Sequence, residues 1–187
     1  MAILYNIKKV VLTELDPKTG APKAEGGVKA TIETAQKAEL EPVLSEGEED
    51  VLRAPEKILA VVRTDDLIYG YDVKLTDNTF GPEVAGLVAG YKVTKGSDGG
   101  QKDKYATPMM TEGFTGKPFK LDIYVANYSG DAIVDYAKVT LNKCIGKFPT
   151  MSIGDGFYAP EFEIKARENT KASLPIKEIT FVDSLPE

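Results

Sequence analysis

Histidine is absent from the 187-residue sequence, and this absence limits the possible chemistry more than any residue that is present. Histidine is the usual general base near neutral pH and the commonest metal ligand. With Cys144 as its one cysteine, the chain can form neither an internal disulfide nor a thiolate–imidazole zinc site. Paired carboxylates stay open as acid–base groups, but a sequence cannot pair them. We therefore expect no catalytic, cofactor or metal site and no enzyme, and we expect Cys144 to be a buried structural residue in a reducing compartment.

Long apolar runs and a basic surplus are also missing. No stretch approaches the roughly 18–20 apolar residues of a membrane helix, so no membrane contact is expected. The start of the chain, apolar residues followed by lysines without a small-residue cleavage site, is typical of a first strand rather than a secretion signal. The net charge of −6 and the acidic pI of about 4.9 argue against a nucleic-acid binder, and contact with polyanions should be repulsive or brief.

Alternating apolar and polar residues are present along most of the chain and predict β-strands. Strand patterns occupy residues 3–15, 28–43 and 58–74, and more follow from residue 118 to the C-terminus. Helix propensity competes with the strand pattern at residues 33–41, but the alternation continues through Leu40 and favours a strand. Short strands separated by Gly, Pro and Asn turns predict a single domain over residues 1–187, mainly β, with a β-sandwich or barrel architecture.

One short helix is predicted between Pro82 and Gly90. Proline suits the first turn of a helix, and glycine suits the residue that ends one. The N-cap is expected at Asn78 or Thr79, since these side chains can accept a backbone N–H. The apolar face of the helix is expected to comprise Val84, Leu87 and Val88.

The strand pattern from Ile58 to Lys74 is too long for a compact domain. About 18 residues at ~3.3 Å each span roughly 60 Å, whereas a domain of this size is about 40 Å across. Either the chain bends at Arg63–Asp66, or the strand overhangs its domain and exposes backbone groups to another chain. The acidic stretch before it, at about residues 42–56, is predicted as an extended loop or arm that becomes ordered on docking. The residues expected to dock are Glu46, Glu48, Glu49, Asp50, Val51 and Leu52.

The sequence resembles the phage major tail proteins, the tail-tube subunits of long-tailed phages and prophages. The resemblance lies in ILAVVRTDDLIYGYDVKLTDNTFGPEVAGLVAG, residues 58–90, and in the C-terminal half from LDIYVANYSGDAIVDYAKVTLNKC to YAPEFEIKAR and FVDSLP. It covers about residue 28 to the end. It implies a β-sandwich flanked by one helix, with long strands that contribute to an inner β-barrel shared between subunits.

The resemblance also implies a function. Six copies would close into a ring, and rings would stack into the tail tube of a virion, assembled in the cytoplasm of a bacterial host. The implied partners are further copies of the chain, the tape-measure protein, tail-tip and terminator proteins, and duplex DNA in passing. Alternatives of the same broad fold are a tail-terminator, a baseplate protein or a type VI-like secretion tube component. A carbohydrate-binding β-sandwich module, with a platform of Tyr69, Tyr71 and Tyr124, is a further alternative.

Strand alternation gives a hypothesis for the residues that line such a tube. If Val28, Ala30 and Ile32 pack inward, the opposite face of the same strand and of its partner would face the channel. An acidic lining would keep DNA from binding, because each Lys or Arg contact with phosphate adds affinity. The lumen-facing residues under this hypothesis are Glu33, Lys37, Glu39, Glu41, Thr64, Asp66 and Asp72.

Overall fold

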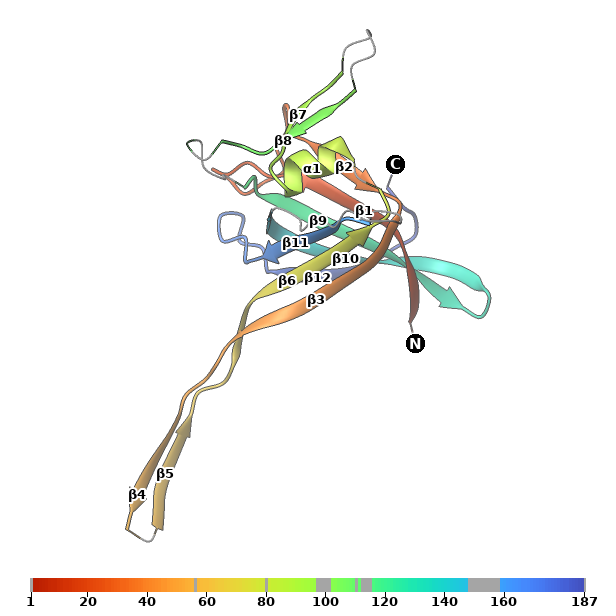
Figure 1. Ribbon diagram of the computed structural model, residues 1–187. Helices are drawn as coiled ribbons and strands as arrows, with labels where there is room; N and C mark the ends of the chain where they lie inside the picture. The colour runs from red at the N-terminus through yellow and green to blue at the C-terminus, as the bar shows by residue number, and fades with distance from the viewer. Residues whose placement is uncertain are drawn as a thin grey trace.

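A computed structural model describes residues 2–55, 57–79, 81–96, 102–109, 111, 116–147 and 159–186. Within these residues the chain forms twelve strands and one short helix. Figure 1 shows a body of strands from which a long two-stranded arm projects on one side. The predicted mainly β chain is thereby confirmed.

One large antiparallel sheet makes up the body. β10 is long enough to pair with three strands: β9 along one edge, and β12 and then β11 along the other. β2 and β3 lie at opposite ends of the strand order although only two residues separate them, so the sheet curls back on itself. The order is β2 (Lys29–Ile32), β1 (Ile3–Glu14), β9 (Phe119–Ser129), β10 (Ala132–Gly146), β11 (Glu161–Ala166), β6 (Leu67–Asp77) and β3 (Ala35–Ser45), with β12 (Lys177–Val182) on β10.

A single apolar core fills the inside of this curve. Alternate residues of the strands supply it, as the period of two requires: on β2, Ala30 and Ile32 are buried as the sequence predicts. Cys144 is also fully buried, as expected. The largest buried side chains of the core are Leu12, Leu75, Phe119, Leu121, Leu141, Phe162 and Ile164.

The segment predicted as one strand at 28–43 is two strands. Residues 33–41 do not form a helix, as predicted, but Glu33 and Thr34 form a turn between β2 and β3 and belong to neither strand. The Thr34 hydroxyl donates to Asp77 Oδ1 at 2.5 Å, at the far end of β6. This turn carries the chain from one end of the sheet order to the other.

The helix α1 (Pro82–Val88) closes one end of the core, against β2 and β10. Its predicted apolar face is confirmed: Val84, Leu87 and Val88 are buried. The predicted N-cap is wrong, because Gly81 occupies that position without a side-chain hydrogen bond. The Thr79 hydroxyl instead donates to Asp77 Oδ2 at 3.2 Å. It therefore interacts with the last residue of β6 and does not cap the helix. After α1 the chain forms a small hairpin, β7 (Lys92–Thr94) and β8 (Lys104–Ala106).

Residues 42–56 were predicted as an extended loop or arm, and the structure forms an arm whose residues are mostly in strands rather than in a loop. Residues 42–45 belong to β3, and β4 (Glu49–Ala54) pairs with β5 (Lys57–Arg63) in a two-stranded ribbon. For the long strand the sequence left two options, a bend at Arg63–Asp66 or an overhang, and the structure shows both. The ladder breaks at residues 64–66, and the ribbon beyond the break overhangs the body as the arm (Figure 1). The carboxylates suggested a loop because two of them, Glu46 and Glu48, lie in the break, and the other two, Glu49 and Asp50, are the first residues of β4.

Candidate functional site

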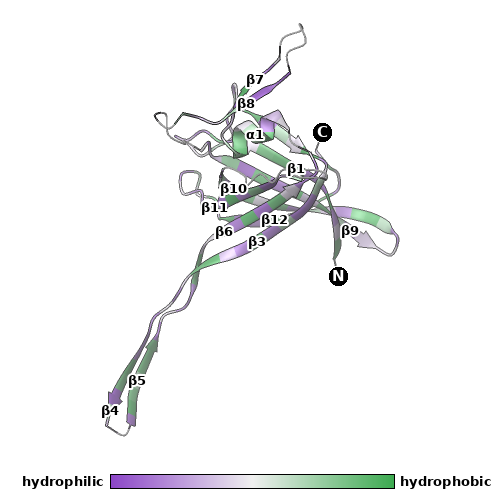
Figure 2. Ribbon diagram, in the orientation of Figure 1, coloured by the Kyte–Doolittle hydropathy of each residue, from purple (hydrophilic) through white to green (hydrophobic). Residues whose placement is uncertain are grey.

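The arm formed by β4 and β5 carries apolar side chains on both faces. Val51 lies opposite Val61 on one face, and Leu52 lies opposite Ala60 on the other. Figure 2 shows hydrophobic residues along both strands of this ribbon. The exposed large hydrophobic residues of the arm are Leu52, Ile58, Leu59, Val61 and Val62, each more than half exposed. Among the described residues no third strand pairs with this ribbon, and an isolated two-stranded ribbon is marginally stable in water, so these faces are suited to a partner.

Side-chain hydrogen bonds hold the base of the arm together where the ladder is interrupted. The backbone N–H of Glu48 donates to Thr64 Oγ1 at 2.8 Å, and the N–H of Thr64 donates to the Glu48 carbonyl at 3.0 Å. The N–H of Gly47 donates to Asp66 Oδ1 at 2.8 Å. A Cβ on Gly47 would lie 1.8 Å from the Thr64 carbonyl oxygen, so this close approach needs glycine. The direction of the arm is therefore fixed by its base.

The residues expected to dock are distributed between the base and the ribbon. Glu46 and Glu48 lie in the base, and residues 49–52 form the first part of β4. All four carboxylates from Glu46 to Asp50 are exposed, and within the described part of the chain none of them forms an ion pair. Leu52 is exposed and Val51 is half-buried.

Four of the seven residues predicted to face a lumen share one face of the sheet. Lys37, Glu39 and Glu41 alternate with Ala38 and Leu40, which pack against the core. They therefore point away from the core. Asp72 lies directly opposite Glu41 on β6 and on the same outward face.

The same outward face carries lysines that the sequence prediction did not include. Lys74 lies opposite Glu39, and Lys165 on β11 lies opposite Asp72. A bond of 2.5 Å joins Lys37 to Glu39, and this bond raises the pKa of the amine and lowers the pKa of the carboxyl. The face thus mixes lysines with carboxylates, among them Glu163 opposite Lys74, and is not uniformly acidic. The alternation within β6 and β11 predicts that Lys74 and Lys165 point outward, but only the strand order shows which carboxylates lie opposite them.

The other three residues predicted to face a lumen do not join this face. Glu33 lies in the turn between β2 and β3, with its carboxylate 3.7 Å from Lys9 Nζ. Thr64 and Asp66 belong to the base of the arm, where their side chains accept the backbone N–H groups described above. Their contribution in this structure is to fix the arm.

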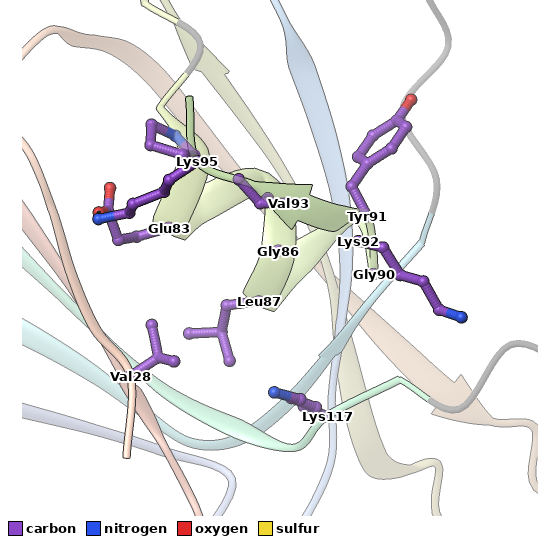
Figure 3. A pocket seen from close by; sticks show the side chains of 11 residues that line it. Val28, Glu83, Gly86, Leu87, Gly90, Tyr91, Lys92, Val93, Lys95 and Lys117 are labelled. Atoms are coloured by element: carbon purple, nitrogen blue, oxygen red, sulfur yellow. The ribbon is translucent and has the colours of Figure 1, made fainter. Parts of the chain in front are cut away.

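A cavity of about 460 Å³ lies beside α1 and β7 (Figure 3). Leu87 and Val28 give it an apolar side, and Figure 3 shows Lys117 pointing toward it. Lys95 Nζ lies 3.7 Å from Glu83 Oε1, so these two charged residues of the cavity lining form an ion pair with each other. This arrangement offers shape and an ion pair, and it does not bring together a nucleophile and a base.

Other candidate groups are isolated from one another. Within the described ranges no three His, Cys, Asp or Glu side chains are grouped closely enough to bind a metal ion. Burial raises the pKa of the Cys144 thiol, which keeps it protonated and unreactive. Tyr124 on β9 is only 6% exposed, whereas Tyr69 on β6 is exposed, so the tyrosines do not form one sugar-binding platform.

Comparison with known proteins adds no assignment: neither any protein-family model nor any curated protein matches this chain. None of the helical residues in the described part of the chain forms a helix long and apolar enough to cross a membrane.

Proposed function

We propose that this protein is a structural subunit of a phage tail tube. In this proposal copies close into hexameric rings, and rings stack into a hollow tube through which the genome is delivered. The single observation that carries the proposal is the arm, a ribbon with two apolar faces that projects from the body and that none of the described residues covers. A subunit designed for self-assembly needs such a surface, and a monomer does not.

The energetics favour a partner for the arm. Burying one Val, Leu or Ile side chain contributes about 1.5–3 kcal/mol relative to leaving it exposed. The exposed apolar side chains of the arm, already half exposed or more, therefore offer on the order of 5 kcal/mol to a surface that covers them. Repeated around a ring and between rings, contacts of this size are sufficient to hold a tube.

We further propose a sandwich-like tail-tube fold in which β3 and β6 contribute to an inner barrel. β3 is the last strand in the sheet order, and no described strand pairs with its outer edge, which in this proposal pairs with a strand of another copy. The lumen would then be lined by the outward face with Lys37, Glu39, Glu41 and Asp72. On β3 and β6 the lysines lie among carboxylates, so these two strands present no continuous cationic strip to phosphate, and DNA would pass along them without binding. The tape-measure, tail-tip and terminator proteins are the further partners of such a tube.

Negative-stain electron microscopy of the purified, concentrated protein tests the proposal. The expected result is hollow filaments of uniform diameter with six-fold end views. Separate small particles at every concentration, under conditions in which the protein is folded by circular dichroism, would contradict it.

A further inference from the structure

We infer that the acidic segment Glu46–Asp50 at the base of the arm binds a basic pocket between β10 and β11 of a neighbouring copy. This contact would give the assembly a head-to-tail direction. The inference rests on the proposed self-assembly and specifies which two surfaces meet. It follows from the composition of the pocket, from the charges of the segment, and from the direction of the arm.

The basic pocket lies on the outward face of the sheet, where β10 pairs with β11. Cys144 and Ala166 point into the core, so their neighbours on each strand point outward. The pocket has a volume of about 360 Å³, and its exposed apolar floor is Ile145. Its lining residues are Lys143, Ile145, Gly146, Lys147, Lys165 and Arg167.

Two of the four cations in the pocket have acidic partners within the chain. Lys147 Nζ lies 3.0 Å from Glu163 Oε2, and Arg167 Nη1 lies 3.7 Å from Asp72 Oδ1. Lys143 and Lys165 form no ion pair with any residue that the structure describes. A concave site with an apolar floor and two uncompensated amines is suited to an anion that carries an apolar neighbour.

The acidic segment has the complementary composition. Its four carboxylates are Glu46, Glu48, Glu49 and Asp50, and all are exposed. Val51 and Leu52 follow directly and supply the apolar neighbour. The hydrogen bonds between Glu48 and Thr64 already order the backbone of the segment, so binding costs less conformational entropy than it would for a disordered loop.

The segment meets the pocket of another copy rather than its own. Within one copy it is held by the pairs Ser45–Leu67 on one side and Glu49–Arg63 on the other. Figure 1 shows that the arm beyond this point runs away from β10 and β11. Two different surfaces that bind each other on identical copies make a head-to-tail contact, which closes into rings or propagates into filaments.

A charge-swap experiment on the full chain tests the contact. The pocket variant combines Lys143→Glu with Lys165→Glu, the residues without internal partners, and the segment variant combines Glu48→Lys with Glu49→Lys. The control combines Lys102→Glu with Lys104→Glu, two exposed lysines on and beside β8. Light scattering gives the concentration at which each protein begins to assemble, at low and at high salt.

We expect each reversal alone to raise this assembly concentration about tenfold or more, because attraction becomes repulsion at two positions. The two reversals combined should restore it to near the wild-type value, and the control should match the wild type. Added salt should raise the assembly concentration of the wild type, since salt screens exposed charges.

Several outcomes would overturn the inference without affecting the proposed function. These are pocket variants that assemble like the wild type, a combined variant no better than the single ones, or a control that fails equally. Binding of a short DNA duplex that is lost in the pocket variant, with assembly unchanged, would instead assign the pocket to a polyanion. If the wild type itself never assembles, the proposed function fails and the inference fails with it.

Discussion

The Thr64 hydroxyl accepts a hydrogen bond of 2.8 Å from the backbone N–H of Glu48, across the gap between two β-ladders. On the body side the last pair is Ser45 with Leu67, and on the arm side the first pair is Glu49 with Arg63. This bond acts together with the bond from the Thr64 N–H to the Glu48 carbonyl and the bond from the Gly47 N–H to Asp66 Oδ1, and the three connect the arm to the body. The relationship makes the arm a directed extension of β3 and β6 rather than a free hairpin.

Replacing Thr64 with valine should loosen the base of the arm while it preserves the shape of the side chain. The lost hydrogen bond is worth about 0.5–1.5 kcal/mol. The amide of Glu48 should therefore exchange with deuterium about two- to tenfold faster, with the core strands unchanged. Hydrogen–deuterium exchange followed by mass spectrometry or NMR measures this. Thr31→Val, at an exposed position on β2, is the matched control, and equal exchange in both variants would refute the role of Thr64.

Two glycine substitutions should have opposite effects on thermal stability. A Cβ on Gly146 would lie 2.1 Å from the Val88 carbonyl oxygen, so Gly146→Ala must displace α1 from β10. A Cβ on Gly86, inside α1, meets no atom closer than 3.7 Å, and alanine favours a helix by about 1 kcal/mol over glycine. We expect Gly146→Ala to lower the melting temperature by several degrees and Gly86→Ala to hold or raise it. Differential scanning calorimetry decides; equal melting temperatures for the two variants would contradict this packing.

Glu14 should make the fold sensitive to acid. Burial by itself raises the pKa of this carboxyl, but the N–H of Val28 at 3.0 Å and the amines of Lys117 and Lys23 outweigh burial, so the pKa lies below its usual 4.5. A lowered folded-state pKa gives stability that is present above the unfolded pKa and is lost as the pH falls through the folded value.

Glu14→Gln should therefore cost about 1–3 kcal/mol of unfolding free energy at neutral pH. The difference from the wild type should shrink as the pH falls from the usual pKa of 4.5 through the lowered folded-state pKa, because the wild-type carboxyl then also becomes neutral. Urea denaturation at a series of pH values measures both. A difference that stays constant over this pH range would show that the charge of Glu14 contributes nothing.

The apolar faces of the arm should matter for assembly and not for folding. Leu52 is 61% and Val62 is 64% exposed, so replacing both with serine removes little buried area from the single chain. The free energy of unfolding should change by less than about 0.5 kcal/mol for each substitution. Pelleting of assembled protein in a centrifuge should fall about tenfold or more. Leu174→Ser, at an exposed position outside the arm, serves as the control; pelleting that is equal in both would disconnect the arm from assembly.

Local alternation was sufficient to predict most of the body. The pattern at Ala30 and Ile32 identifies the core face of β2 and, through Lys37, Glu39 and Glu41, the outward face of β3. The turn at Glu33 and Thr34 was not predictable, since a hydrogen bond to Asp77, distant in sequence, stabilises it. The N-cap of α1 was predicted wrongly because the pattern of residues does not show that Thr79 bonds to Asp77 and leaves the cap position to Gly81.

The arm and the mixed charges of the outward face depend on pairing between strands, which no single segment encodes. The carboxylates near Asp50 suggested a solvated loop, and only the opposing residues Val61 and Val62 make that segment a strand. Likewise, Lys165 lies opposite Asp72 only because β11 lies beside β6 in the sheet.

Sedimentation velocity over a wide range of protein concentrations shows whether other copies of the chain complete the projecting arm. The account predicts that the 20.3 kDa chain gives way to ring-sized and then much larger species as the concentration rises. A single boundary at the monomer mass, at every concentration and at low salt, would contradict it.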